Sequence, residues 1–172
     1  MMRWVGVLAR LVVGGVWLYA GALKLPHPDT SVTAVRSYQL LPTGAAETVG
    51  HVLPMLEIVV GACLVLGLLL RFTGAVSAVL LVAFIVGIVS VWSRGIAIDC
   101  GCFGDGGADP DAFSKYPWEI ARDTGLLALS LLLVWRPRTP VALDNVLFPS
   151  TPNEHLPEPE TTRGTDDVEA RS

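Results

Sequence analysis

Four long apolar segments constrain the fold more than any other feature of this sequence. A membrane-spanning helix needs roughly 20 mostly apolar residues, and the candidate segments are about 4–23, 49–70, 72–92 and 118–135. Hydrophobic residues make up 52% of the chain and charged residues only 16%, which leaves too little polar surface for a water-soluble domain. We therefore predict an all-α integral membrane protein, a four-transmembrane-helix bundle in a lipid bilayer.

The first segment has an alternative interpretation as a cleaved signal peptide. Arg3 precedes an apolar run, and Ala20, Gly21 and Ala22 have the small side chains of a cleavage site. Arg10 interrupts the run, however, and three further apolar segments follow. These features favour an uncleaved helix.

Two longer connections and a tail complete the predicted organisation. A short helix over 32–41 is expected at the membrane surface, and Pro117 is expected in the first turn of the fourth span. Residues 1–148 form the predicted membrane domain. Residues 149–172 are rich in Pro and acidic residues and form a predicted disordered tail, because they cannot bury enough apolar surface to fold.

The charge distribution excludes one class of partner and suggests an orientation. No basic run indicates nucleic acid, and most of the net charge of −4 belongs to the segment after residue 135. Arginines close to the span ends are concentrated on the side of the termini: Arg3, Arg71, Arg136 and Arg138. By the positive-inside rule, both termini are predicted to be cytoplasmic and the connection over 93–117 extracytoplasmic, in a multi-pass protein of the cell membrane.

Cys100 and Cys102 are separated by Gly101 in this outer connection and are the predicted catalytic residues. A disulfide between residues so close in sequence forms a small, strained ring, which favours exchange with other thiols. Two thiolates could also bind Cu(I), or the pair could be purely structural. Too few ligands surround them for a zinc site, so no metal is predicted.

Charged residues inside the spans are candidate supporting residues. Arg10 and Glu57 lie several residues inside their helices, where an unpaired charge costs about 2.5 kcal/mol or more. They either fix helix register as a pair or form a proton or quinone site beneath the thiol loop. Arg122 and Asp123 lie near the outer end of the fourth span. They could tune a thiol or handle its proton, or they could be ordinary charges at a helix end.

Several of these segments together resemble a known family. The run from Arg10 to Leu25, and Glu57 followed by Gly61, resemble the first two helices of DoxX-like membrane proteins. The loop from Cys100 to Gly104, followed by Trp118, Arg122 and Asp123, is similar to the branch typified by the methylamine-utilisation protein MauE. The resemblance covers roughly residues 4–148.

This resemblance implies a redox-associated membrane protein that supports the maturation of a secreted enzyme, with an extracytoplasmic thioredoxin-fold partner. It leaves the enzymatic activity open between a thiol-disulfide oxidoreductase and other functions. One alternative is a non-catalytic membrane anchor or assembly factor for a redox partner. Another is a DoxX-type oxidoreductase subunit linked to a membrane quinone.

Overall fold

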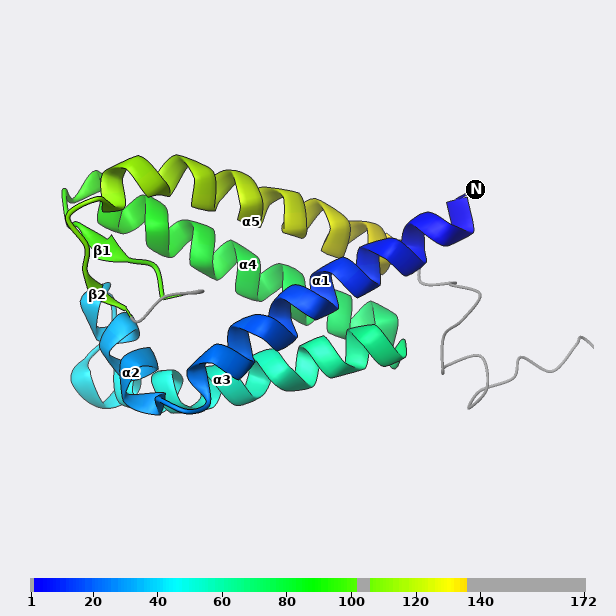
Figure 1. Cartoon of the computed structure of the whole chain (residues 1–172), viewed down its shortest axis with the longest axis horizontal. Helices are drawn as coiled ribbons and strands as arrows, with labels where there is room; N and C mark the ends of the chain where they lie inside the picture. The colour runs from blue at the N-terminus through cyan, green and yellow to red at the C-terminus, as the bar shows by residue number, and fades with distance from the viewer. Residues whose placement is uncertain (1, 102–105, 136–172) are drawn as a thin grey trace, which may run out of the picture.

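Four long helices run side by side in the computed structural model, which describes residues 2–101 and 106–135 (Figure 1). A short helix and a two-stranded hairpin lie together at one end of the bundle. The start of α1 and the end of α5 lie at the opposite end. The elements in chain order are α1 (Met2–Lys24), α2 (Pro28–Ser37), α3 (Thr43–Leu66), α4 (Leu70–Ser93), β1 (Ile98–Asp99), β2 (Gly107–Ala108) and α5 (Ala112–Trp135).

Within the described residues, three of these helices are long and apolar enough to cross a membrane: α1 from Trp4 onward, α3 and α4. The fourth predicted span corresponds to α5, which has the same length as α3 and α4 and packs along α4. Its first half carries Glu119, Arg122 and Asp123, so it is less apolar than the other three. The all-α membrane fold is confirmed, and a membrane crossing by α5 remains a prediction.

The helix boundaries differ from the sequence expectation in three places. α3 begins at Thr43 and ends at Leu66, where Gly67 caps it with a φ of 75°. α2 spans Pro28–Ser37, so it begins and ends four residues before the short helix predicted over 32–41. α5 begins at Ala112, so Pro117 lies inside the helix and not in its first turn. The helix ends thus depend on turn-forming residues. The apolar pattern of the sequence indicates only the middle part of each helix, which faces the membrane.

α1 and α3 approach each other closely because two glycines face each other. A Cβ atom built at Gly14 would lie 2.9 Å from the carbonyl oxygen of Gly61, and one at Gly61 would lie 2.8 Å from that of Gly14. Small residues allow this contact between membrane helices, where packing replaces the hydrophobic effect as the driving force. The contact fixes an antiparallel register for the two helices.

A buried chain of hydrogen bonds joins α1, α4 and α5. Trp17 Nε1 donates to Ser77 Oγ over 2.8 Å, and Ser77 Oγ lies 3.0 Å from Ser130 Oγ. Large apolar side chains such as Leu8, Met55, Phe72 and Val79 instead point outward on α1, α3 and α4. Apolar side chains on the outside and hydrogen bonds between helices on the inside are the arrangement expected of a helix bundle in a lipid bilayer.

Candidate functional site: the cysteine loop and the charges beneath it

Two glycines of the cysteine loop lie close against α2, and a larger residue at either position would be strained. β1 and β2 pair antiparallel, with Ile98 opposite Ala108. Gly101 and Gly106 have φ values of 68° and 69°, in the left-handed region that favours glycine. A Cβ at either position would lie within 2.6 Å of Ala34 Cβ on α2. The glycine between the two cysteines therefore also makes room for α2.

Cys100 follows β1 directly and is only 6% exposed. Tyr38 Oη donates a hydrogen bond to the Cys100 carbonyl oxygen over 2.9 Å. Tyr116 Oη accepts one from Ile98 N over 3.0 Å and donates to Ile96 O over 2.8 Å. The backbone around Cys100 is thus fixed by Tyr38, which follows the end of α2, and by Tyr116 of α5. Cys102, the second predicted catalytic residue, lies outside the described residues.

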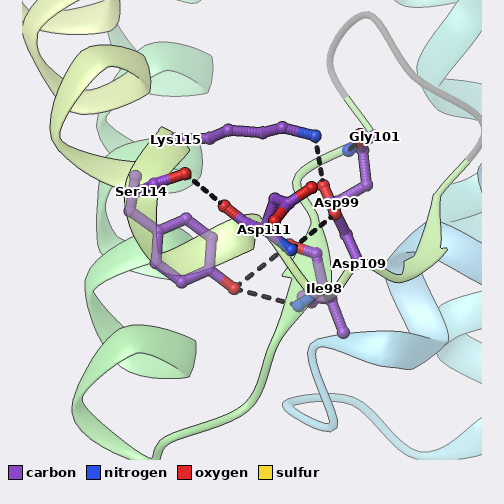
Figure 2. A network of polar contacts seen from close by, with 8 residues as sticks. Ile98, Asp99, Gly101, Asp109, Asp111, Ser114 and Lys115 are labelled. Atoms are coloured by element: carbon purple, nitrogen blue, oxygen red, sulfur yellow. Dashed lines mark hydrogen bonds and ion pairs between the residues drawn. The ribbon is translucent and has the colours of Figure 1, made fainter.

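An ion pair fixes the other side of the hairpin (Figure 2). Lys115 Nζ lies 2.6 Å from Asp109 Oδ2, and the backbone N–H of Asp111 donates to Asp109 Oδ1 over 3.0 Å. These hydrogen bonds, that from Lys115 first, lower the pKa of Asp109 below its usual value. The same contact raises the pKa of Lys115. The pair joins the end of β2 to the first turn of α5.

Glu119 is the charged side chain that reaches the thiol. Its carboxylate lies within hydrogen-bonding reach of the Cys100 side chain. Its second oxygen, Oε2, is buried and has no hydrogen-bond partner among the described residues. Glu119 lies on α5, one turn before Asp123. A carboxylate in this position can exchange a proton with Cys100 Sγ.

Beneath the loop, Glu57 is fully buried and pairs with Lys24, with 2.5 Å between Lys24 Nζ and Glu57 Oε1. Lys24 is itself buried at the end of α1, and its Nζ lies 6.0 Å from the centre of the Phe84 ring. A buried ion pair offsets the large cost of taking each charge out of water only when the partners are in direct contact, as here.

The register of α1 against α3 explains why Lys24, and not Arg10, reaches Glu57. Gly14 lies opposite Gly61, and Gly21 lies opposite the Pro54–Ile58 segment. Arg10 is therefore level with Val65, to whose carbonyl oxygen it donates over 3.3 Å, about two helical turns from Glu57. Long side chains on a helix lean toward its N-terminus, so Lys24 leans back toward the level of Glu57.

Arg122 and Asp123 form a second ion pair on α5, with 2.9 Å between Arg122 Nη2 and Asp123 Oδ1. Together with Glu57, these two residues line one cavity of about 20 Å³. The rest of its lining is mainly apolar: Val16, Trp17, Ala20, Leu81, Phe84 and Leu126. The structure thus gathers three of the four predicted supporting residues around one small space and leaves Arg10 outside its lining.

Sequence reasoning missed two members of this arrangement, Lys24 and Glu119. Lys24 directly precedes the two prolines that end the first predicted span, a position typical of a loop charge. Glu119 lies near the start of the fourth predicted span, where an acidic residue commonly interacts only with the helix dipole. Its spacing from Asp123 by one helical turn could have indicated a shared face, but no sequence pattern places either residue beside the cysteine loop or Glu57.

Comparison with known proteins gives a consistent family assignment. The family model described as "Methylamine utilisation protein MauE" matches residues 2–136. Methylamine utilization protein MauE of Paracoccus denitrificans is 30% identical over 125 residues, covering 72% of this chain and 65% of that protein. The protein of the same name from Methylorubrum extorquens is 33% identical over 114 residues, covering 65% of this chain and 59% of that protein. The chain thus spans somewhat less than two thirds of the length of these relatives. No solved structure matches it.

Proposed function

This chain belongs to the methylamine utilisation protein MauE family, and on that premise we propose that it exchanges disulfides with a secreted redox protein at its Cys100/Cys102 loop. The observation that carries the proposal is the Glu119 carboxylate within hydrogen-bonding reach of the buried Cys100 side chain. Thiol-disulfide exchange needs a proton acceptor for the attacking or leaving sulfur. Glu119 supplies this group near the start of α5, and α5 starts at the end of the bundle that carries the hairpin (Figure 1).

The burial of Cys100 suggests a division of roles between the two cysteines. Because Cys100 is only 6% exposed, a partner thiolate would attack Cys102 Sγ in the oxidised loop. The bond between the two cysteines breaks, and Cys100 leaves with the electron pair and takes a proton from Glu119. The second thiolate of the same partner then attacks the partner's sulfur in the mixed disulfide, and Cys102 leaves with the electron pair and takes a proton from water. The loop disulfide is thereby reduced to a dithiol, and the partner dithiol is oxidised to a disulfide.

The partner and pathway are proposed from the family. The two relatives are named for methylamine utilisation, and we extend that association to this chain. A thioredoxin-fold protein outside the cytoplasm is the proposed partner, because such proteins present a pair of thiols suited to this exchange. This proposal requires the cytoplasmic termini and extracytoplasmic Cys loop that the charge pattern predicts.

Glutathione provides a defined probe for the exchange. In a redox titration of the solubilised protein, alkylation should show Cys100 and Cys102 changing together between dithiol and disulfide. Cys100→Ser should accumulate a glutathione adduct on Cys102, because the resolving thiol is gone. Cys102→Ser should accumulate much less, because Cys100 is buried. Equal adducts in both variants would overturn the assigned roles.

Glu119→Gln tests the proton-exchanging group. The variant keeps the size of the side chain but cannot release a proton, so exchange should slow. Glu47→Gln is the matched control, because Glu47 is exposed and pairs only with Arg36 among the described residues. The Glu47→Gln variant should exchange disulfides at the same rate as the unmodified protein. An unchanged rate in Glu119→Gln would remove Glu119 from the mechanism.

A non-catalytic anchor is the second candidate, favoured by the burial of Cys100 and the fixed backbone around it. Such a protein would recruit the redox partner through a docking loop whose cysteines stay oxidised. Reversibility separates the two functions: a loop that remains oxidised across the glutathione titration contradicts exchange and supports the anchor.

A quinone-linked oxidoreductase fits the described interior poorly. The cavity beside Glu57 measures about 20 Å³, whereas a cavity that admits one benzene ring measures about 150 Å³. We therefore derive no step through a quinone. Quinone-dependent reoxidation of the dithiol that is lost in Glu57→Gln would restore this candidate.

A further inference from the structure

Glu57 and Asp123 line the cavity, and each keeps one carboxylate oxygen that no described group donates to. Glu57 Oε1 is bound by Lys24, and Asp123 Oδ1 is bound by Arg122. The other oxygens, Glu57 Oε2 and Asp123 Oδ2, are buried and have no hydrogen-bond partner among the described residues. Their side chains are 0% and 3% exposed. A buried acceptor without a hydrogen bond costs free energy of folding. A molecule that donates two hydrogen bonds would remove this cost at both oxygens.

The size and charge of the site narrow the choice of that molecule. A cavity needs about 10–15 Å³ of this kind of space to hold one water, and this cavity offers about 20 Å³. Two cations and two anions, Lys24, Arg122, Glu57 and Asp123, already balance one another. A metal ion would add uncompensated charge to this neutral group, whereas water is neutral and carries two donors.

We propose that this cavity binds one water molecule, which donates one hydrogen bond to Glu57 Oε2 and the other to Asp123 Oδ2. Glu57 belongs to α3, which packs on α1, and Asp123 belongs to α5, which packs on α4. The water therefore connects the two helix pairs through hydrogen bonds that the side chains do not make directly. This inference does not depend on thiol exchange at the loop.

Trp17 provides a reporter for the bound water, because it lines the cavity and is only 4% exposed. Hydroxyl radicals generated from water by a brief X-ray pulse oxidise side chains that touch that water. We expect oxidation of Trp17 in the solubilised full chain. After rapid mixing into water that carries heavy oxygen, Trp17 should still take up light oxygen at short delays. The exposed His27 should take up heavy oxygen at once.

Two double variants make the test specific. Lys24→Met with Glu57→Leu removes one acceptor together with its counter-charge, so oxidation of Trp17 should fall severalfold. Arg36→Met with Glu47→Leu removes a surface ion pair by the same kinds of substitution, and it should leave Trp17 oxidation unchanged. Trp17 oxidation that is equal in the two double variants would overturn the proposal.

If the first double variant does not fold, the unmodified protein still decides the question. Trp17 that resists oxidation, or that takes up heavy oxygen as fast as His27, contradicts a bound water. Glu57→Gln adds a further check, because its amide keeps the size and an oxygen acceptor. Delayed uptake of heavy oxygen at Trp17 should persist in that variant, and its loss there would contradict the proposed geometry.

Discussion

At the scale of single residues, the interior of this bundle is defined by charges whose partners are close in space but far apart in sequence. Glu57 pairs with Lys24, 33 residues away, and Glu119 lies within reach of the Cys100 side chain. A charge inside a membrane protein must find such a partner or face water. The identity of each partner therefore determines both stability and the chemistry available at the site.

Removing one member of the buried pair should be far more harmful than removing both. Lys24→Met leaves the Glu57 carboxylate buried without its counter-charge and should lower the free energy of unfolding by about 3–5 kcal/mol. Lys24→Met combined with Glu57→Leu should recover most of this loss. Unfolding of the solubilised protein in a denaturing detergent measures both effects.

The exposed pair Arg36 and Glu47 is the matched control. Arg36→Met should change the free energy of unfolding by no more than about 1 kcal/mol, because surface ion pairs contribute little. A loss in Lys24→Met as small as that in Arg36→Met would show that the buried pair is not required for the fold.

The hairpin should loosen in acid because of Asp109. Its folded-state pKa lies below its usual value, chiefly through the hydrogen bond from Lys115. Its contribution to stability is therefore complete above the unfolded-state pKa and is lost as the pH falls through the folded-state pKa. Amide hydrogen exchange of residues 107–112, corrected for intrinsic rates, should accelerate over this range.

Asp109→Asn provides the control for this pH dependence. The variant lacks the titrating carboxylate, so exchange in the same segment should be faster at neutral pH and should vary little over the acidic range. Acid-dependent loosening that persists in Asp109→Asn would assign the effect to another group.

At the scale of elements, helix packing depends on a few positions where no side chain fits. Gly14 and Gly61 bring the backbones of α1 and α3 into contact, and this contact sets the register that places Lys24 at Glu57. The same principle operates at the hairpin, where Gly101 and Gly106 admit Ala34 of α2. Small residues thus position both parts of the candidate site.

Neighbouring glycines in α1 allow a sharp test of this packing. In Gly14→Ala the new Cβ would meet Val65 Cγ2 at 2.8 Å and the Gly61 carbonyl oxygen at 2.9 Å, so overpacking should cost about 1–3 kcal/mol. In Gly15→Ala the Cβ has no neighbour within 4 Å, so stability should be unchanged or slightly raised. Thermal unfolding of the two solubilised variants compares them, and equal stabilities would refute the close contact.

At the scale of the whole molecule, the bundle has two chemically different ends. One end carries the start of α1 and the end of α5, and the other carries α2 and the cysteine hairpin (Figure 1). The proposed exchange with a secreted partner requires the hairpin end to face away from the cytoplasm. A membrane-impermeant alkylating reagent applied to intact cells should therefore label the cysteines only after mild reduction. Labelling that requires permeabilised cells would reverse the proposed orientation.

The sequence by itself determined the all-α membrane fold, because apolar segments of bilayer length have few other stable states. It also identified Cys100, Glu57, Arg122 and Asp123 as candidates, because thiols close together and charges within apolar helices are chemically conspicuous. The tail that is predicted to be disordered and Cys102 lie outside the described residues, so both remain predictions.

Only the tertiary structure decided which of these residues meet. The register of α1 against α3 depends on backbone contact at two glycines, and apolar patterning does not report that contact. That register paired Glu57 with Lys24 and placed Arg10 beside Val65. The packing of α5 against the hairpin likewise brought Glu119 to Cys100. Partner choice between distant residues is a property of packing, whereas the tendency to enter a membrane is a property of composition.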